Sequence, residues 1–247
     1  MLNQFSRTAL LIGEDGLQKL KNSRVAVFGI GGVGGHAVEA LVRSGVGTID
    51  IVDNDVFSLT NLNRQIFATH KTIGKNKVDV AKERLLEINP DLKINAYNTF
   101  FTPENSSDFD FANYDYVIDA IDTVTGKIEL VVKSQESNTP IISSMGAGNK
   151  MNPTMFEVSD IYKTSVCPLA KVMRQELKKR HIKKLKVVYS KEEPIKPIVN
   201  DELKASEPNK RNIAGSNAFV PSVAGLIIAS EVVKDLIRRE FWFCFNK

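Results

Sequence analysis

The sequence predicts an α/β fold, in which helices cover both faces of a mostly parallel β-sheet. Short apolar runs alternate with amphipathic stretches between residues 24 and 150, and the first run ends in a glycine-rich turn. The composition is ordinary for a globular chain, with 43% hydrophobic and 25% charged residues. At 247 residues the chain is long enough to bury a large core. Collagen, a disulfide-rich miniprotein and a wholly disordered chain are excluded.

The expected elements follow in order along the chain. Residues 1–23 are expected to form an N-terminal helical arm. Short runs rich in β-branched residues predict strands at 24–29, 47–53, 92–98, 114–120 and 139–145. Amphipathic stretches predict helices at 32–43, 75–88 and 125–137. The second helix should stop at Asn89-Pro90, because the residue before a proline disfavours helical backbone. Residues 24–150 thus form the predicted nucleotide-binding unit.

Residues 151–247 are expected to continue the sheet and to serve substrate binding and dimerisation, within one integrated domain. The same patterns predict a strand at 154–160, a basic helix at 168–181, a strand at 185–190 and a final helix at 219–238. Residues 191–212 contain Pro194, Pro197, Pro208 and many charges, which predicts a mobile surface loop.

Cysteine content and the apolar runs limit the classes of protein further. Cys167 and Cys244 are the only cysteines, so a zinc site of four cysteines is impossible. The N-terminus lacks the cationic-then-apolar order of a signal peptide. The longest uncharged run, residues 213–230, is interrupted by Asn217 and Pro221, which favours a buried helix start over a membrane span. We expect a cytoplasmic protein.

The glycine-rich turn is a candidate phosphate-binding loop. Gly29, Gly31, Gly32 and Gly34 fit G-x-G-x-x-G between a predicted strand and a predicted helix. Glycines allow the backbone to approach a phosphate, and the helix N-terminus stabilises its charge. Asp53 ends the next strand nineteen residues after Gly34, where a carboxylate can accept a hydrogen bond from a ribose hydroxyl. This much fits an NAD enzyme as well as an ATP enzyme.

Two cations after the second strand favour ATP over NAD. Arg64 in NLNRQ and Lys77 in GKNK lie thirteen residues apart. A triphosphate carries more charge than a dinucleotide, and more charge develops as pyrophosphate leaves. Alternatively, the two residues are ordinary surface cations. Asp119 and Asp122 lie at the end of the strand predicted at 114–120, where a carboxylate can hold Mg²⁺ or cap the next helix.

These motifs together resemble the ubiquitin-activating-enzyme-like adenylyltransferases of the ThiF, MoeB and HesA type. The resemblance rests on GIGGVG, Asp53-x-Asp55, NLNRQ, GKNK and the DAID segment, and it covers about residues 5–150. It implies adenylation of a carboxylate by ATP with Mg²⁺, in a Rossmann-like fold and a homodimer. By the resemblance, Asp53 binds the ribose, Arg64 and Lys77 bind the phosphates, Asp122 binds Mg²⁺, and Arg7 enters the partner subunit's site. Asp55, Asn61 and Gln65 belong to the same ATP-binding motifs.

Further features resemble the tRNA threonylcarbamoyladenosine dehydratase branch of these enzymes. They are residues 160–164 (DIYKT), residues 168–170 (PLA), a basic helix directly afterwards, and Gly215-Ser216 before a hydrophobic helix. The paired Cys-x-x-Cys motifs of the zinc-containing branches are absent from the sequence, so no zinc is expected. The resemblance implies activation of the threonine carboxylate of the modified adenosine beside the anticodon. Ring closure to an oxazolone would then expel AMP.

The segment from Lys171 to Lys186 contains eight lysines or arginines and one acid, Glu176. It is either a solvated helix face, with Leu169, Met173 and Leu177 facing the core, or a phosphate-binding patch. The resemblance to a tRNA-modifying branch favours the patch. Its candidate tRNA-binding residues are Arg174, Lys178, Lys179, Arg180, Lys183 and Lys184.

Other functions stay open at this point. The chain could adenylate a ubiquitin-like sulfur carrier, reduce or oxidise a substrate with NAD, or act as a non-catalytic scaffold. Sulfur-transfer or redox proteins are conceivable partners. Cys167 is more easily explained as an inert residue than as a nucleophile. The aromatic tail, residues 241–245, could rest on a membrane, but packing on the body or on a partner subunit is favoured.

Overall fold

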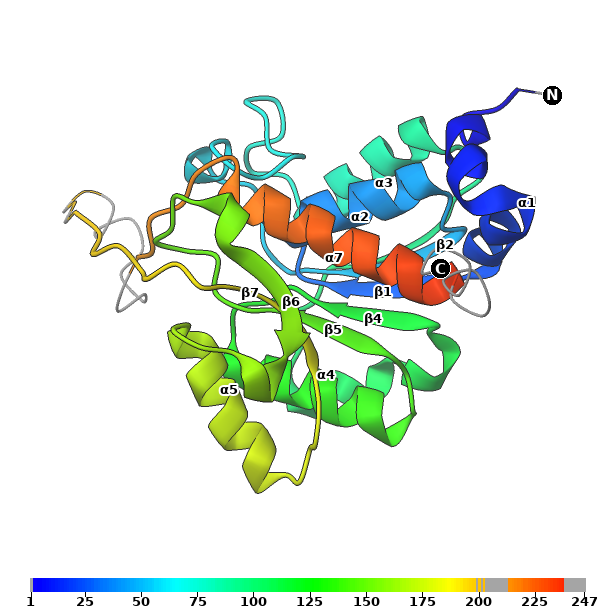
Figure 1. The fold of residues 1–247 in the computed structure, drawn as a ribbon. Coiled ribbons are helices and arrows are strands. Elements are labelled where there is room, and N and C mark those ends of the chain that lie inside the picture. Colours follow the sequence, from blue (N-terminus) through cyan, green and yellow to red (C-terminus); the bar gives the residue numbers. More distant parts are fainter. Residues whose placement is uncertain (1, 199, 201, 203–212, 238–247) are drawn as a thin grey trace.

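The computed structural model describes residues 2–198, 200, 202 and 213–237 (Figure 1). Its centre is a seven-stranded sheet in the order β3-β2-β1-β4-β5-β7-β6. All neighbouring strands are parallel except β6 and β7. The strands are β1 (Arg24–Phe28), β2 (Thr48–Val52), β3 (Lys93–Tyr97), β4 (Tyr116–Asp119), β5 (Ile141–Ser144), β6 (Phe156–Asp160) and β7 (Lys186–Ser190). The predicted mostly parallel sheet is confirmed.

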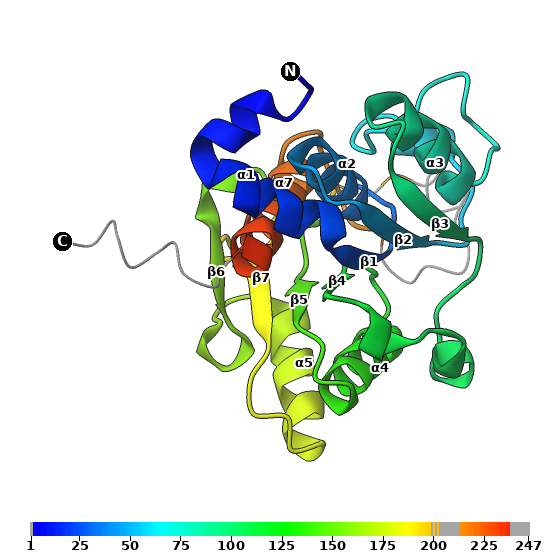
Figure 2. The same ribbon diagram turned by 90° about the vertical axis from the view of Figure 1, so that its right-hand side faces the viewer.

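Helices cover both faces of this sheet, as the sequence predicts (Figure 2). One face carries α2 (Gly34–Ser44), α3 (Lys77–Ile88) and α7 (Val220–Ile237), with α1 (Ser6–Asn22) packed against α7. The other face carries α4 (Val124–Glu136) and α5 (Pro168–Lys179). Within the described ranges, no helix is both long and apolar enough to cross a bilayer. The aromatic tail at 241–245 and Cys244 lie outside the described residues.

The connection from β3 to β4 contains short 3₁₀ turns, η2 (Pro103–Asp108) and η3 (Phe111–Asn113), where the sequence pattern predicts no element. Its aromatic side chains cover β1 on the α4 side of the sheet. Phe28 is in ring contact with Phe101 at 4.9 Å, Phe109 at 5.3 Å and Phe111 at 6.0 Å between centroids. These rings fill the space that a crossover helix would occupy, and they pack against β1.

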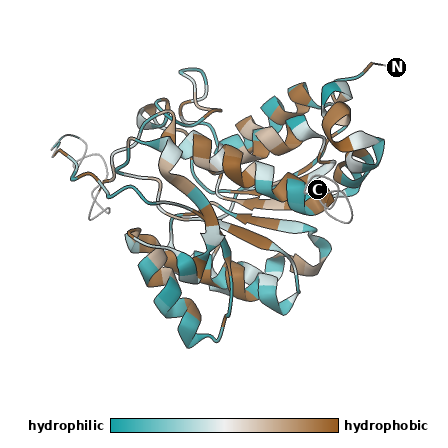
Figure 3. Cartoon of the chain, in the orientation of Figure 1, coloured by the Kyte–Doolittle hydropathy of each residue, from teal (hydrophilic) through white to brown (hydrophobic). Residues whose placement is uncertain are grey.

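The C-terminal helix α7 is packed on α2 and is hydrophobic along most of its length (Figure 3). A Cβ atom at Gly225 would lie 2.3 Å from the carbonyl oxygen of Val33, so only glycine allows the two helices to come this close. The start of α7 therefore sits beside the start of α2. This contact joins the last part of the chain to the glycine-rich loop.

The described part of the chain contains three further 3₁₀ turns: η1 (Leu59–Asn61), η4 (Pro153–Met155) and η5 (Ile161–Lys163). The chain runs from β1 outward to β3 and then returns to β4 on the other side of β1. The direction of the strand order thus reverses between β1 and β4. In open α/β sheets, ligands bind at the carboxyl edge of such a switch point.

Candidate active site

The glycine-rich loop follows β1 and packs on the turn that follows β4. Gly29 has a φ of 90°, and a Cβ there would lie 2.7 Å from the carbonyl oxygen of Ala120. A Cβ at Gly34 would lie 1.8 Å from the carbonyl oxygen of Gly29. Both glycines are therefore required by close backbone contacts. The loop leads into α2 at the switch point, and the first N–H groups of a helix are suited to bind an anion.

Asp53 connects the loop after β2 to the glycine-rich loop. Its carboxylate accepts hydrogen bonds from the backbone N–H of Ile30 at 2.7 Å and of Asp55 at 2.9 Å. Each oxygen thus accepts one backbone hydrogen bond and keeps a further lone pair. A ribose hydroxyl could use that acceptor capacity.

Lys77, the first residue of α3, is brought to the same carboxylate. The residue is only 5% exposed, and its Nζ lies 2.6 Å from Asp55 Oδ2 and 3.7 Å from Asp53 Oδ1. Three residues predicted for the site therefore form one cluster. The Asp55 carboxylate is itself largely exposed, so an incoming phosphate could take its place beside the ammonium of Lys77.

The NLNRQ segment lies beside the glycine-rich loop. Asn61 closes the η1 turn by accepting a hydrogen bond from the backbone N–H of Ser58. Arg64 Nη1 donates to the Thr60 carbonyl and to Asn63 Oδ1, and its Cγ lies 3.3 Å from the position of a Cβ at Gly32. The guanidinium group therefore belongs to a segment in contact with the loop.

Gln65 and the glycines beside it fit a bound nucleotide. Gln65 is 7% exposed, and its Oε1 has no hydrogen-bond partner among the described residues. A Cβ at Gly31 would lie 3.8 Å from its Nε2, which places the amide at the loop. A buried amide oxygen without a partner is costly, unless a ligand donor or a water satisfies it. The glycine-rich loop could hold the phosphates of ATP, and Gln65 Oε1 could accept a hydrogen bond from the nucleotide.

The two carboxylates after β4 have different surroundings. Asp119 is fully buried and accepts two hydrogen bonds from Lys127 Nζ, at 2.9 and 3.0 Å. Asp119 is therefore committed to an internal ion pair and is not available to Mg²⁺, contrary to one expectation from the sequence. Asp122 is exposed, three residues further along. A single carboxylate together with phosphate oxygens is a donor set that Mg²⁺ accepts.

A segment just before α7 completes this edge, although no local pattern assigns it to the nucleotide site. Asn63 Nδ2 donates to the Ser216 carbonyl at 3.0 Å, and a Cβ at Gly32 would lie 3.2 Å from Pro221 Cβ. Only the family resemblance singles out Gly215-Ser216. More than 150 residues separate Asn63 from Ser216 along the chain, so no local pattern could have predicted their contact.

Arg7 is a predicted catalytic residue that lies away from its own glycine-rich loop, because Phe5, two residues earlier, lies 3.5 Å from the position of a Cβ at Gly45, at the opposite end of α2. It is exposed at the start of α1. Figure 1 shows α1 at the right, by the end of α7, whereas the loops that follow the strands gather at the left, by the start of α7. A role for Arg7 within its own subunit's site would require a large movement of α1.

The predicted tRNA-binding residues lie on α5 and in the segment directly after it, and only some of them have side-chain partners. Glu176 accepts hydrogen bonds from Lys179 at 2.6 Å and Arg180 at 2.9 Å, which hold the pKa of Glu176 below its ordinary value. Arg174 donates to Thr164. The remaining three, Lys178, Lys183 and Lys184, are exposed. Met173 and Leu177 are buried, as the predicted apolar stripe requires.

Comparison with known proteins identifies the family, because the sequence matches the ThiF family over residues 5–241. The chain belongs to the ThiF family. The tRNA threonylcarbamoyladenosine dehydratase of Bacillus subtilis (strain 168) is 49% identical to it over 246 residues, which cover 96% of each chain. The enzyme of that name from Haemophilus influenzae is 34% identical, over 96% of this family member and 94% of the relative.

Solved structures agree with this assignment to the ThiF family. The Escherichia coli tRNA N6-threonylcarbamoyladenosine dehydratase in complex with AMP is 33% identical, with a TM-score of 0.85. The match covers 95% of this chain and 94% of that chain. The complex of the same enzyme with ATP gives a TM-score of 0.84. The Rossmann-like arrangement predicted from the sequence is thereby confirmed.

Proposed function

We propose that this ThiF-family chain is an ATP-dependent tRNA threonylcarbamoyladenosine dehydratase. The 49% identity to a relative of that name, over nearly the whole of both chains, carries the proposal. The cluster of Gly29, Asp53, Arg64 and Lys77 at one sheet edge supports it, because an adenylating enzyme needs these groups together. AMP and ATP complexes of a structural neighbour favour ATP over NAD.

The site's own residues account for the first chemical step. A carboxylate oxygen attacks the α-phosphorus of ATP, an acyl–phosphate bond forms, and the bond to pyrophosphate breaks. Backbone N–H groups at the start of α2 would hold phosphate oxygens, and Arg64 and Lys77 would stabilise the charge on departing pyrophosphate. An internal nucleophile of the modified adenosine then attacks the activated carbonyl, closes the ring and releases AMP.

Asp122 would hold Mg²⁺, which when bound neutralises phosphate charge. The exposed carboxylate of Asp122 and the internal pairing of Asp119 support this assignment. Zinc has no part in the proposal. The cytoplasm remains the predicted compartment.

We propose in addition that the enzyme is a homodimer in which Arg7 completes the partner's site. The N-terminal arm that carries Arg7 lies at the end of α2 opposite the glycine-rich loop, where Phe5 meets Gly45, and this placement supports the arrangement. Arg7→Ala and Asp122→Ala homodimers should then both be nearly inactive. Mixing them should restore roughly a quarter of all sites, because about half the dimers are mixed and each mixed dimer has one intact site. Unrestored activity after confirmed subunit exchange would contradict the shared site.

A pyrophosphate-exchange assay tests the proposed function directly. Wild-type protein is incubated with ATP, Mg²⁺ and labelled pyrophosphate, together with threonylcarbamoylated tRNA, a ubiquitin-like sulfur carrier, or no acceptor. We expect label to enter ATP only with the modified tRNA. Exchange with the sulfur carrier alone would establish the alternative adenylyltransferase function. Binding of reduced nicotinamide without exchange would establish an oxidoreductase, and no activity in any arm would support a scaffold.

A further inference from the structure

Three lysines are buried among the described residues, and they differ in their partners. Lys77 and Lys127 each have a carboxylate oxygen nearby, at 2.6 Å from Asp55 and 2.9 Å from Asp119. Lys150 is 4% exposed, and no carboxylate of the described residues lies within 4.0 Å of its Nζ. Its hydrogen bond goes to the backbone carbonyl of Glu192. An ammonium with three donors is thus buried beside one neutral acceptor.

The carboxylate of the residue that accepts this hydrogen bond, Glu192, is committed elsewhere. The carboxylate of Glu192 accepts hydrogen bonds from the backbone N–H groups of Met151 at 2.8 Å and Asn152 at 2.9 Å. Those contacts fix the loop after β5 to the segment after β7, and they leave the Lys150 charge uncompensated by its neighbour. Burying a charge without a counter-ion is costly, so such a group is a candidate for binding an anion.

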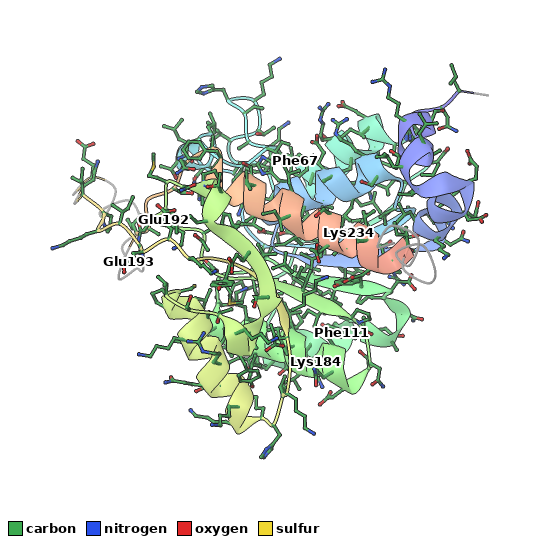
Figure 4. All side chains as sticks on the ribbon, in the orientation of Figure 1. Phe67, Phe111, Lys184, Glu192, Glu193 and Lys234 are labelled. Atoms are coloured by element: carbon green, nitrogen blue, oxygen red, sulfur yellow. The ribbon has the colours of Figure 1, made fainter. Side chains whose placement is uncertain are left out.

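Lys150 lies on the same sheet edge as the nucleotide residues. Its carbonyl oxygen accepts a hydrogen bond from Asn217 Nδ2 at 2.8 Å. The neighbouring Ser216 carbonyl accepts one from Asn63, directly before Arg64. Figure 4 labels Glu192, the hydrogen-bond partner of Lys150, among the loops gathered at this edge.

The backbone around Lys150 is held in one arrangement. Asn149 adopts a left-handed φ of 59°, which asparagine tolerates better than most residues. Its N–H donates to the Gly215 carbonyl, and its Oδ1 accepts from the Gly215 N–H, both at 2.7 Å. These contacts tie the loop that carries Lys150 to the segment before α7.

We propose that Lys150 binds the carboxylate of the acceptor substrate. One carboxylate oxygen would accept from the Lys150 ammonium while the other attacks the α-phosphorus. The inference rests on the proposed function for the identity of that acceptor, the threonylcarbamoyl group. A protein C-terminus offers the same carboxylate chemistry, and the experiment below separates the two sources. This role makes Lys150 a determinant of acceptor specificity that is distinct from the phosphate-binding cations.

The test compares an anticodon stem-loop carrying the threonylcarbamoyl group with the same RNA lacking it. Lys150→Gln keeps a donor toward the Glu192 carbonyl and removes the charge, whereas Lys150→Arg keeps the charge. Lys191→Gln is the matched control, because Lys191 is an exposed lysine nearby, paired with Glu157 at 2.5 Å. Equilibrium binding of both RNAs, ATP binding and thermal stability are measured for each variant.

We expect Lys150→Gln to weaken binding of the modified RNA roughly ten- to hundred-fold, the range for loss of a charge-assisted hydrogen bond. Binding of the unmodified RNA and of ATP should stay unchanged, Lys150→Arg should retain part of the preference, and Lys191→Gln all of it. A preference for modified RNA that survives in Lys150→Gln would overturn the proposal. So would an equal loss for both RNAs, which indicates a backbone phosphate contact, or a loss of ATP binding and thermal stability, which indicates a structural role.

If the wild-type protein does not distinguish the two RNAs, the proposed tRNA function fails and the carboxylate is sought elsewhere. The same variants are then compared on a sulfur-carrier protein with either a free or an amidated C-terminus. Loss of discrimination in Lys150→Gln supports the Lys150 inference even in that case. Unchanged discrimination, or no discrimination by the wild-type protein, overturns it.

Discussion

Gly29 and Ala120 are in backbone contact across the switch point of the sheet, although 91 residues separate them in the sequence. A Cβ at Gly29 would lie only 2.7 Å from the carbonyl oxygen of Ala120, which is too close for a side chain at this position. The phosphate-binding loop and the turn leading to Asp122 therefore form one continuous surface. A shift of either loop would move the other.

This contact predicts unequal effects for two glycines with positive φ. Gly29 has a φ of 90° and meets Ala120, whereas Gly74 has a φ of 81° and nothing within 4 Å of an added Cβ. Gly74→Ala should cost about 1–2 kcal/mol of unfolding free energy from backbone strain alone. Gly29→Ala should cost more and should abolish ATP binding, measured by denaturant unfolding and by titration with ATP. Equal unfolding costs with ATP binding retained would contradict the contact's importance.

Arg64→Ala and Lys77→Ala should each slow adenylation more than they weaken AMP binding. Both cations are assigned to phosphates that AMP lacks, so each loss should reduce the rate by about 10²–10³-fold. Pyrophosphate exchange and AMP titration measure the two quantities. If rate and AMP affinity fell by the same factor, the residues would be supporting the fold rather than the transition state.

Neutralising Asp119 should reduce stability, whereas neutralising Asp122 should reduce Mg²⁺-dependent ATP binding. Asp119→Asn leaves the fully buried Lys127 without its counter-ion, and breaking a buried pair typically costs about 3–5 kcal/mol. Asp122→Asn should leave stability unchanged but weaken Mg²⁺-dependent ATP binding, with partial recovery at high Mg²⁺. Thermal melts and ATP titrations at several Mg²⁺ concentrations distinguish the two. An unaltered Mg²⁺ dependence in Asp122→Asn would remove its assignment as a metal ligand.

The exposed lysines of the basic segment should govern the salt dependence of tRNA binding. Replacing Lys178, Lys183 and Lys184 by alanine should lower the slope of log K against log salt by up to about three units. Arg174→Ala is the comparison within α5, because its guanidinium is bonded to Thr164. ATP binding should not change. An unaltered slope in the triple variant would show that this segment is a solvated surface.

Acid should remove a contact between α7 and the sheet. Lys186 Nζ lies 2.6 Å from Glu231 and 2.8 Å from Asp235. Burial alone would raise the pKa of Glu231, but hydrogen bonds from Lys186 and Lys234 outweigh it, so this pKa lies below its ordinary 4.5. A lowered folded-state pKa stabilises the protein above about pH 4.5, and that contribution is lost as pH falls further. Lys186→Met should therefore reduce unfolding free energy at pH 7, and the difference should shrink in acid. A difference that stays constant from pH 7 to pH 3 would contradict the assignment.

Local sequence patterns are sufficient for most of the fold and for much of the site. Strand and helix periodicities, the glycine-rich turn and Asp53 at a strand end all depend on residues close in the chain. Most strand boundaries differ from the predicted ones by one or two residues, and the basic helix ends at Lys179 rather than at residue 181. The aromatic connection from β3 to β4 has no periodicity, because its rings fill a space irregularly instead of lining one face.

Long-range contacts account for what the sequence does not predict. Ser216 and Pro221 reach the site through tertiary packing, with no nearby motif. The Asp119–Lys127 pair is explained by burial, since Lys127 lies within α4 between Gly126 and Ile128, which are also buried. A lysine at such a position needs a counter-ion, and Asp119 lies eight residues earlier, at the end of the preceding strand. The burial of Lys127 therefore distinguishes Asp119 from Asp122, and it becomes visible only in the structure.

The close packing of α7 on α2 sets an order on folding during synthesis. The glycine-rich loop is translated before its partners, because its contact with Pro221 and the Val33–Gly225 contact require residues that follow it by about 190 positions. A nascent chain that ends before residue 213 therefore exposes an apolar groove along α2 and lacks one wall of its ATP site. Nucleotide binding should thus appear only after α7 has left the ribosome and has packed on α2.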